Sequence, residues 1–256
     1  MKTVLLGGGY GTRMSHSSEV IPKPMVKIGD YPILWHIMKT YYAYGFKDFI
    51  ICAGYKQDKI KEFFSNYHDY HTNMTVYTST NKIIYNRKEE IEDWKVMIQD
   101  TGLDTSTGGR IKRIGNYIFD DDLFFLSYGD GLSAININKL LEFHKSHGKL
   151  ATVTAIQYQG RYGTLDLSEQ DMVHSFKEKP TKESWISGGY FVLNKKVLDY
   201  IEGDNTVFEY EPLQNLAKDG ELMAYKYTGF WKAMDFLRER DELTKMWNKG
   251  DAPWKV

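Results

Sequence analysis

The sequence predicts an α/β fold built on a mostly parallel sheet, and the pattern of apolar runs carries that prediction. Short apolar runs alternate with helix-like patterns along the chain, as in βαβ units. The first run, Val4–Leu6, passes directly into a glycine-rich stretch, and the run 123–128 passes into Gly129-Asp130-Gly131. In doubly wound sheets, ligands bind at the carboxyl ends of the strands. The glycine-rich stretch therefore marks the expected ligand-binding edge.

The individual elements follow from the apolar runs and their stop signals. Gly45 and Gly148 end two of the helical patterns. We expect a single domain over residues 1–256, with a β-rich appendage at 72–100 and a C-terminal helical tail at 236–256. The expected strands are 2–6, 49–52, 123–128, 150–157 and a late strand that ends with Val192-Leu193, and the expected helices are 34–44, 56–67, 135–147 and 236–247.

Composition excludes several classes of function. The 256 residues are 42% hydrophobic and 15% aromatic, enough for a sizeable core. The formal net charge of -1 gives no basic footprint for nucleic acid. No apolar run approaches membrane-spanning length, and the N-terminal run is too short for a signal peptide. We therefore expect a soluble cytoplasmic protein that binds neither nucleic acid nor membrane.

The single cysteine, Cys52, lies in an apolar run from Phe49 to Ala53. One cysteine permits no disulfide within the chain and no cysteine-rich metal site. We interpret Cys52 as a small buried hydrophobe rather than a nucleophile.

The stretch from Gly7 to Arg13 is followed by Pro22-Lys23-Pro24 and predicts a phosphate-binding loop. Packing does not explain its glycines, which bring no side chain and lose the most entropy on ordering. They allow backbone N–H groups to approach phosphate oxygens, and an arginine suits the same ligand. The spacing fits neither a P-loop nor a dinucleotide fingerprint, so the alternative is a plain turn with two solvated cations. We favour nucleotide binding.

The remaining polar clusters are ambiguous one at a time. Asp130 follows a strand, which suits a metal bound to phosphates, but an Asp-Gly pair also forms ordinary turns. Asp235 precedes the last helix, where a helix N-cap is the simpler interpretation. Three further clusters are compatible with either a turn or a ligand contact: Thr107-Gly108-Gly109-Arg110, Glu178-Lys179-Pro180 and Ser187-Gly188-Gly189-Tyr190.

Taken in order, these motifs resemble the glucose-1-phosphate cytidylyltransferases of the sugar nucleotidyltransferase family. The resemblance covers nearly the whole chain. It also includes the motifs 32–38, 160–163, 211–213 and 252–255. It implies a Rossmann-like, mixed and mostly parallel sheet flanked by helices. It further implies an Mg²⁺-dependent transfer in which an acceptor phosphate attacks the α-phosphorus of CTP and pyrophosphate leaves.

The resemblance also implies roles for individual residues. Arg13 and Lys23 would be catalytic, with Lys23 stabilising charge at the α-phosphate. Asp130 and Asp235 would hold Mg²⁺. The nucleotide would be bound by Leu6, Gly8, Gly9, Gly11, Thr12, Arg13, Lys23, Thr107, Arg110 and Asp130, and the acceptor by Tyr128, Glu178, Lys179, Ser187 and Gly188.

The sequence departs from the family pattern at a few positions. Ser187 stands where the family usually has asparagine, and Gly7 replaces the usual alanine. The segment 15–19 also lacks the common acidic pair. Because a hydroxyl is shorter than an amide and lacks one donor–acceptor pair, the change at Ser187 bears on the acceptor rather than on the transfer.

We therefore expect a cytidylyltransferase that makes a CDP-sugar for surface polysaccharide, with glucose 1-phosphate as the favoured acceptor. The alternative keeps CTP and uses another phosphorylated small molecule, such as the amino-acid derivative phosphoglutamine, in capsule modification. The third hypothesis is a catalytically silent nucleotide-binding subunit. The presence of Lys23, Asp130 and Asp235 together argues against it. The family also implies a homo-oligomer, with 67–100 and the C-terminal helix as contacts.

Overall fold

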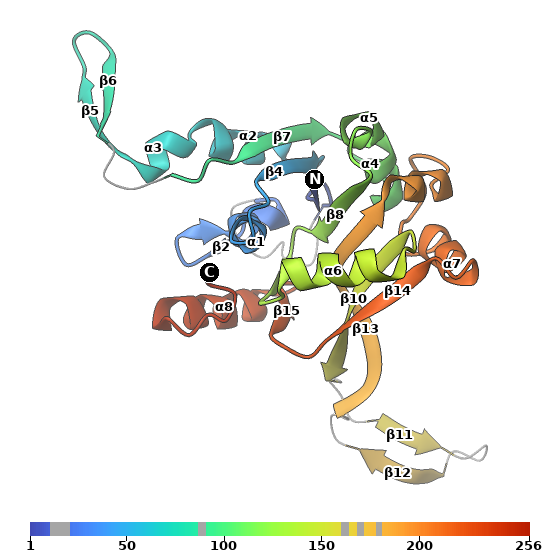
Figure 1. The fold of residues 1–256 in the computed structure, drawn as a ribbon. Coiled ribbons are helices and arrows are strands. Elements are labelled where there is room, and N and C mark those ends of the chain that lie inside the picture. The colour runs from blue at the N-terminus through green and yellow to red at the C-terminus, as the bar shows by residue number, and fades with distance from the viewer. Residues whose placement is uncertain (11–20, 87–90, 160–163, 168–171, 178–180) are drawn as a thin grey trace.

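The computed structural model describes residues 1–10, 21–86, 91–159, 164–167, 172–177 and 181–256 (Figure 1). Its centre is a seven-stranded sheet of order β14-β10-β13-β8-β1-β4-β7. Only β13 runs antiparallel to its two neighbours, and the other pairs are parallel. The fold is thus the predicted mixed, mostly parallel sheet flanked by helices.

The strands of the central sheet are β1 (Thr3–Leu6), β4 (Asp48–Ala53), β7 (Lys95–Asp100), β8 (Leu123–Tyr128), β10 (Ala151–Gln159), β13 (Thr181–Asn194) and β14 (Leu222–Tyr227). Four small two-stranded sheets pair β2 (Lys27–Ile28) with β3 (Tyr31–Pro32), β5 (Asn73–Tyr77) with β6 (Lys82–Asn86), β9 (Gly131–Ser133) with β15 (Trp231–Ala233), and β11 (Thr164–Leu167) with β12 (Val173–Lys177). The helices are η2 (Lys23–Met25), α1 (Ile33–Tyr42), α2 (Gln57–Ser65), α3 (Tyr67–His71), α4 (Thr107–Arg113), α5 (Gly115–Ile118), α6 (Ile137–His147), η3 (Lys195–Tyr200), α7 (Glu211–Lys218) and α8 (Leu237–Lys249).

Alternation along the central strands builds a core on each face of the sheet. In β1, Leu5 packs into one apolar cluster while Val4 and Leu6 pack into the other. Residues of α1, α2, α6 and α8 complete the first cluster, and residues of α4, α5, η3 and α7 complete the second. Because both faces are covered, the strand reads as a continuous apolar run rather than an alternating one.

Two parts of the fold differ from the sequence-based expectation. The stretch 72–100 was predicted as one appendage, but β7 pairs with β4 and forms an edge of the central sheet. Only the hairpin β5–β6 projects from the body in that region (Figure 1). A second hairpin, β11–β12, also projects and had no counterpart in the prediction. Both differences concern long-range pairing, which local apolar patterns do not encode.

The described part of the chain contains no helix both long and apolar enough to cross a bilayer.

Cys52 is fully buried in β4, and its thiol contacts the Arg110 carbonyl at 3.9 Å. Burial raises the pKa of the Cys52 thiol to about 12, although the Arg110 charge opposes the shift. The thiolate is therefore absent near neutral pH, which agrees with the interpretation of Cys52 as a buried hydrophobe.

We predict that Cys52 in the native protein resists a thiol-reactive disulfide reagent at about pH 8 and reacts fully once guanidinium unfolds the chain. The absorbance of the released chromophore measures the labelling. Rapid stoichiometric labelling of the folded protein would contradict this account of Cys52.

Candidate active site

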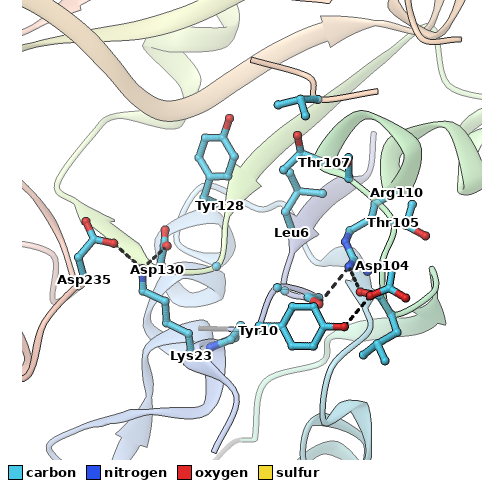
Figure 2. A pocket seen from close by; sticks show the side chains of 18 residues that line it. Leu6, Tyr10, Lys23, Asp104, Thr105, Thr107, Arg110, Tyr128, Asp130 and Asp235 are labelled. Carbon is cyan, nitrogen blue, oxygen red and sulfur yellow. Dashed lines mark hydrogen bonds and ion pairs between the residues drawn. The ribbon is translucent and has the colours of Figure 1, made fainter. Parts of the chain in front are cut away.

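A cavity of about 590 Å³ opens at the carboxyl ends of β1 and β8 (Figure 2). It is lined by residues 6–10, 23–24, 103–107, 110, 128–130, 207 and 235. β1 lies between β4 and β8 in the sheet, so the glycine loop that follows β1 lies near the middle of the sheet edge. This is the edge at which the sequence placed the ligand.

The backbone of the glycine loop is held on both sides. The Gly7 amide donates to the Cys52 carbonyl at 3.0 Å, and the Tyr55 amide donates to the Gly8 carbonyl at 3.1 Å. An added Cβ at Gly8 would lie 2.2 Å from Nη1 of Arg110. Glycine is needed at this position because a guanidinium packs directly against the loop.

Arg110, on α4, is 4% exposed and binds the backbone around the cavity. Its Nη1 donates to the Gly102 carbonyl at 2.7 Å and to the Thr101 hydroxyl at 2.8 Å. Its Nη2 donates to the Gly8 carbonyl at 3.1 Å and the Leu103 carbonyl at 3.2 Å. The guanidinium thus fastens the glycine loop to the loop after β7, and a role in binding the triphosphate stays a prediction.

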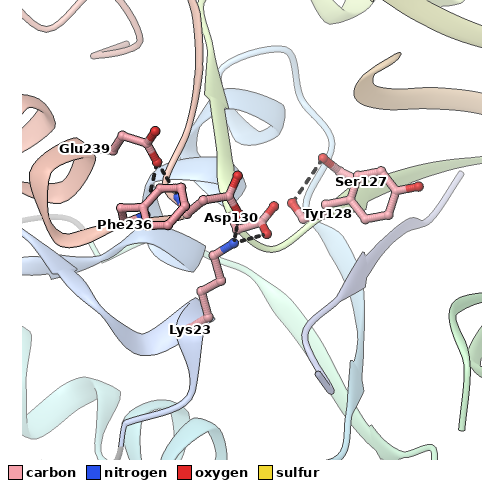
Figure 3. A network of polar contacts seen from close by, with 7 residues as sticks. Lys23, Ser127, Tyr128, Asp130, Phe236 and Glu239 are labelled. Atoms are coloured by element: carbon pink, nitrogen blue, oxygen red, sulfur yellow. Dashed lines mark hydrogen bonds and ion pairs between the residues drawn. The ribbon is translucent and has the colours of Figure 1, made fainter. Parts of the chain in front are cut away.

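Lys23 forms the most concentrated charge cluster in the cavity. Its Nζ donates to Oδ2 of Asp130 at 2.6 Å and to Oδ1 of Asp235 at 2.7 Å (Figure 3). The lysine side chain is 15% exposed. Burial acts to lower the pKa of Lys23, but the two carboxylates outweigh it and raise that pKa. Lys23 is therefore a fixed cation at neutral pH.

Local structure explains how carboxylates more than a hundred residues apart meet. Asp130 follows β8 and precedes β9, which pairs with β15 just before Asp235. The Met234 amide donates to the Asp130 carbonyl at 2.8 Å. Glu239 in α8 accepts from the amides of Asp235 and Phe236 at 2.6 and 3.1 Å, so its carboxylate caps the start of the helix. Asp235 is consequently fixed at the entry to the helix.

A smaller cavity of about 50 Å³ adjoins the first and shares Tyr128 and Asp130 with it. Ser187, Gly188 and Gly189 line its other side. Gly189 has a φ of +76°, and an added Cβ there would lie 2.6 Å from the Tyr128 ring. The Ser187 hydroxyl accepts from the Gly189 amide at 3.3 Å. The expected acceptor residues among the described ones therefore gather beside the main cavity.

The structure brings together all of the predicted site residues that it describes. Those around the two cavities are Leu6, Gly8, Gly9, Lys23, Thr107, Arg110, Tyr128, Asp130, Ser187, Gly188 and Asp235. The predicted residues Gly11, Thr12, Arg13, Glu178 and Lys179 lie outside the described residues.

Sequence reasoning missed several residues that line the cavity or support its wall. Tyr10 donates to Asp104 at 2.6 Å and tilts against Tyr55, which ties the glycine loop to the loop after β7. Glu209 accepts from Thr107 at 2.6 Å and also from Tyr128. A tyrosine next to three glycines was a usable signal for the first contact. Nothing local marks Glu209.

The chain belongs to the nucleotidyl transferase family, whose model matches residues 2–234. It is 49% identical to the glucose-1-phosphate cytidylyltransferase of Salmonella typhi, over 100% of this chain and 99% of that protein. It is 48% identical to the probable glucose-1-phosphate cytidylyltransferase of Bacillus subtilis, over the full length of both. The predicted resemblance is confirmed, and the chain is a nucleotidyltransferase.

Solved structures share the fold. The crystal structure of HddC from Yersinia pseudotuberculosis superposes with a TM-score of 0.70 at 25% identity, covering 96% of this chain and 99% of that one. A UDP-glucose pyrophosphorylase complexed with UDP-glucose superposes with a TM-score of 0.67 at 16% identity, covering 97% and 98%. At that identity, the second likeness concerns the fold alone.

We predict that Arg110→Lys lowers the free energy of unfolding by about 2–4 kcal/mol, because an ammonium leaves several buried carbonyls unsatisfied. Arg113→Lys is the matched control on the same helix, since Arg113 is exposed and pairs with Asp204. We expect about 1 kcal/mol or less there. Chemical denaturation measures both, and equal losses would contradict the clamp assigned to Arg110.

Proposed function

We propose that this chain transfers the cytidylyl group of CTP to the phosphate of a sugar 1-phosphate, with glucose 1-phosphate as the favoured acceptor. The observation that carries the proposal is Lys23 held between two carboxylates at the carboxyl edge of the sheet. The choice of CTP and glucose 1-phosphate rests on the full-length similarity to relatives named for that reaction. The product would be a CDP-sugar for surface polysaccharide, made in the cytoplasm.

The reaction is an in-line displacement at the α-phosphorus. An anionic oxygen of the acceptor phosphate forms the new P–O bond, and the bond to the β-phosphate oxygen breaks. Pyrophosphate leaves with the electron pair, so no general base is needed. Such a reaction depends on positioning and charge neutralisation. Lys23, fixed as a cation, is suited to stabilise the charge that develops at the α-phosphate.

The carboxylates fit a magnesium ion held jointly with the nucleotide. Asp130 and Asp235 both accept from one cation, the Lys23 ammonium, at 2.6 and 2.7 Å. Hard oxygen donors from one or two carboxylates, completed by substrate phosphates and water, are typical of Mg²⁺ sites. The described residues contain no group of three or more His, Cys, Asp or Glu that would bind a metal alone. When bound, Mg²⁺ would neutralise phosphate charge.

Because Lys23 occupies the position between the carboxylates, a second cation there meets charge repulsion. The phosphates of CTP offer Lys23 an alternative partner. We therefore propose that metal binding depends on the nucleotide, which draws the ammonium away from the carboxylates.

The alternative acceptor is another phosphorylated small molecule, such as a phosphorylated amino-acid derivative in capsule modification. Ser187 favours it, because the side chain is short and already accepts from the Gly189 amide. The serine side chain extends less far toward a sugar hydroxyl than an asparagine at the same position would.

We also propose that the chain assembles into a homo-oligomer through the hairpin β5–β6. Apolar side chains cover the projecting hairpin, which is unusual for a free surface. They are Met74, Val76, Tyr77, Ile83, Ile84 and Tyr85, each at least 38% exposed. The exposed polar face of α8 offers a weaker case for a second contact.

Pyrophosphate release with CTP, Mg²⁺ and a panel of phosphorylated acceptors tests the function. We predict the highest kcat/KM with glucose 1-phosphate. Turnover only with a different acceptor would change the proposed acceptor substrate but support the proposed cytidylyl transfer. CTP binding with no turnover across the panel would contradict the proposed reaction and favour a silent nucleotide-binding subunit.

We predict that Asp130→Asn and Lys23→Ala each lower kcat by at least about 100-fold without unfolding the protein. Asp121→Asn is the matched control, because Asp121 pairs with Lys2 at 2.7 Å beside the amino end of β1, away from the cavity. Near-normal turnover in either cavity variant would overturn the site.

Mn²⁺ binding, followed by electron paramagnetic resonance, tests the metal arrangement apart from activity. We predict weak binding to the wild type without CTP and at least about tenfold tighter binding with it. Lys23→Met should bind Mn²⁺ without CTP. Equal Mn²⁺ affinity in the wild type with and without CTP would refute the competition.

A further inference from the structure

Glu209 lies between η3 and α7, outside the residues that line either cavity, yet it touches two that do. Its Oε1 accepts a hydrogen bond from the Tyr128 hydroxyl, and its Oε2 accepts one from the Thr107 hydroxyl at 2.6 Å. Tyr128 ends β8 and Thr107 begins α4. One carboxylate therefore connects two sides of the cavity wall.

The contacts fix the direction in which both hydroxyls donate. A carboxylate only accepts hydrogen bonds, so each hydroxyl donates its single proton to Glu209 in a hydrogen bond. Burial and the nearby Glu209 charge raise the pKa of Tyr128, which keeps its proton in place. The Thr107 oxygen also accepts from the Phe208 amide at 2.9 Å. Both hydroxyl oxygens can therefore accept a hydrogen bond from a ligand, but neither has a proton left to donate.

The Tyr128 ring is held in place as well. Its edge meets the Phe191 ring at a centroid distance of 6.1 Å, and Gly189 packs closely against its other side. In Figure 2 the ring extends away from Lys23 and Asp130. Tyr128 is shared by the main cavity and the smaller cavity beside Ser187. A ligand in either cavity therefore meets a fixed Tyr128 side chain whose hydroxyl accepts hydrogen bonds but does not donate them.

We propose that Glu209 is a positioning residue that fixes the Tyr128 and Thr107 hydroxyls as hydrogen-bond acceptors, and that Tyr128, which lines both cavities, thereby selects an acceptor substrate presenting a hydroxyl or amino donor. The inference deepens the proposed function and rests on it, since it concerns the acceptor side of the same site. Glu209 acts through Tyr128 and does not take part in the transfer.

The test is a double-mutant cycle of Glu209→Gln and Tyr128→Phe, with glucose 1-phosphate as the varied substrate. Glutamine has nearly the same shape, but its NH₂ group donates to one hydroxyl and lets that hydroxyl turn its proton toward the cavity. We expect Glu209→Gln to raise the KM for glucose 1-phosphate at least fivefold, with kcat and the KM for CTP changed less than twofold. The double variant should raise it no further than the larger single variant.

Asp219→Asn is the control, because Asp219 accepts from the exposed Tyr200 hydroxyl at 3.0 Å, away from both cavities. Its kinetic constants should equal those of the wild type. Thermal unfolding of every variant shows whether a change in KM accompanies lost stability.

The possible results separate this inference from the proposed function. A wild type that prefers another panel acceptor revises the substrate, and the same cycle measured with that acceptor then decides. A wild type that turns over no acceptor overturns the proposed function and the inference together. An active wild type with unchanged acceptor KM in Glu209→Gln, additive effects in the double variant, or an equal rise in the KM for CTP overturns the inference alone.

Discussion

The ion bridge from Lys23 to Asp130 and Asp235 is the interaction around which the site is organised. It gathers three segments, the turn η2, the end of β8 and the entry to α8, at one point of the sheet edge. Two carboxylates this close repel one another unless a cation lies between them. Lys23 supplies that cation. The same arrangement places a lysine and two carboxylate oxygens in the cavity where we propose that the phosphates of a nucleotide bind.

The rest of the fold keeps this point rigid. β1 lies near the middle of the sheet, packed on both faces, and its carboxyl end positions the glycine loop. Arg110 then fastens that loop to the loop after β7, using donors that an exposed arginine would offer to a ligand. The β9–β15 ladder and the hydrogen bonds from the amides of Asp235 and Phe236 to Glu239 do the same for the two carboxylates. These contacts therefore hold the described part of the glycine-rich loop in one conformation.

Local patterns in the sequence were enough to predict the sheet and most of its strands, because buried strands are short apolar runs between polar turns. They also identified Lys23, Asp130 and Asp235 as candidates, although neither carboxylate was persuasive alone. That the two carboxylates meet depends on the pairing of β9 with β15, distant in sequence, which no local pattern encodes. β7 was assigned to an appendage because its short apolar run, Val96–Ile98, lies in a stretch from 72 to 100 that is otherwise mostly polar. Glu209 and the internal contacts of Arg110 arise only when separate loops converge.

We propose that Lys23 and a metal ion share one position between Asp130 and Asp235 and exchange there when nucleotide binds. A crystal structure with CTP and Mn²⁺, with data collected at the manganese absorption edge, tests it most directly. The account predicts an anomalous peak between the two carboxylates and the Lys23 ammonium moved onto the nucleotide phosphates. A peak elsewhere, or Lys23 still bridging both carboxylates with CTP bound, would contradict it.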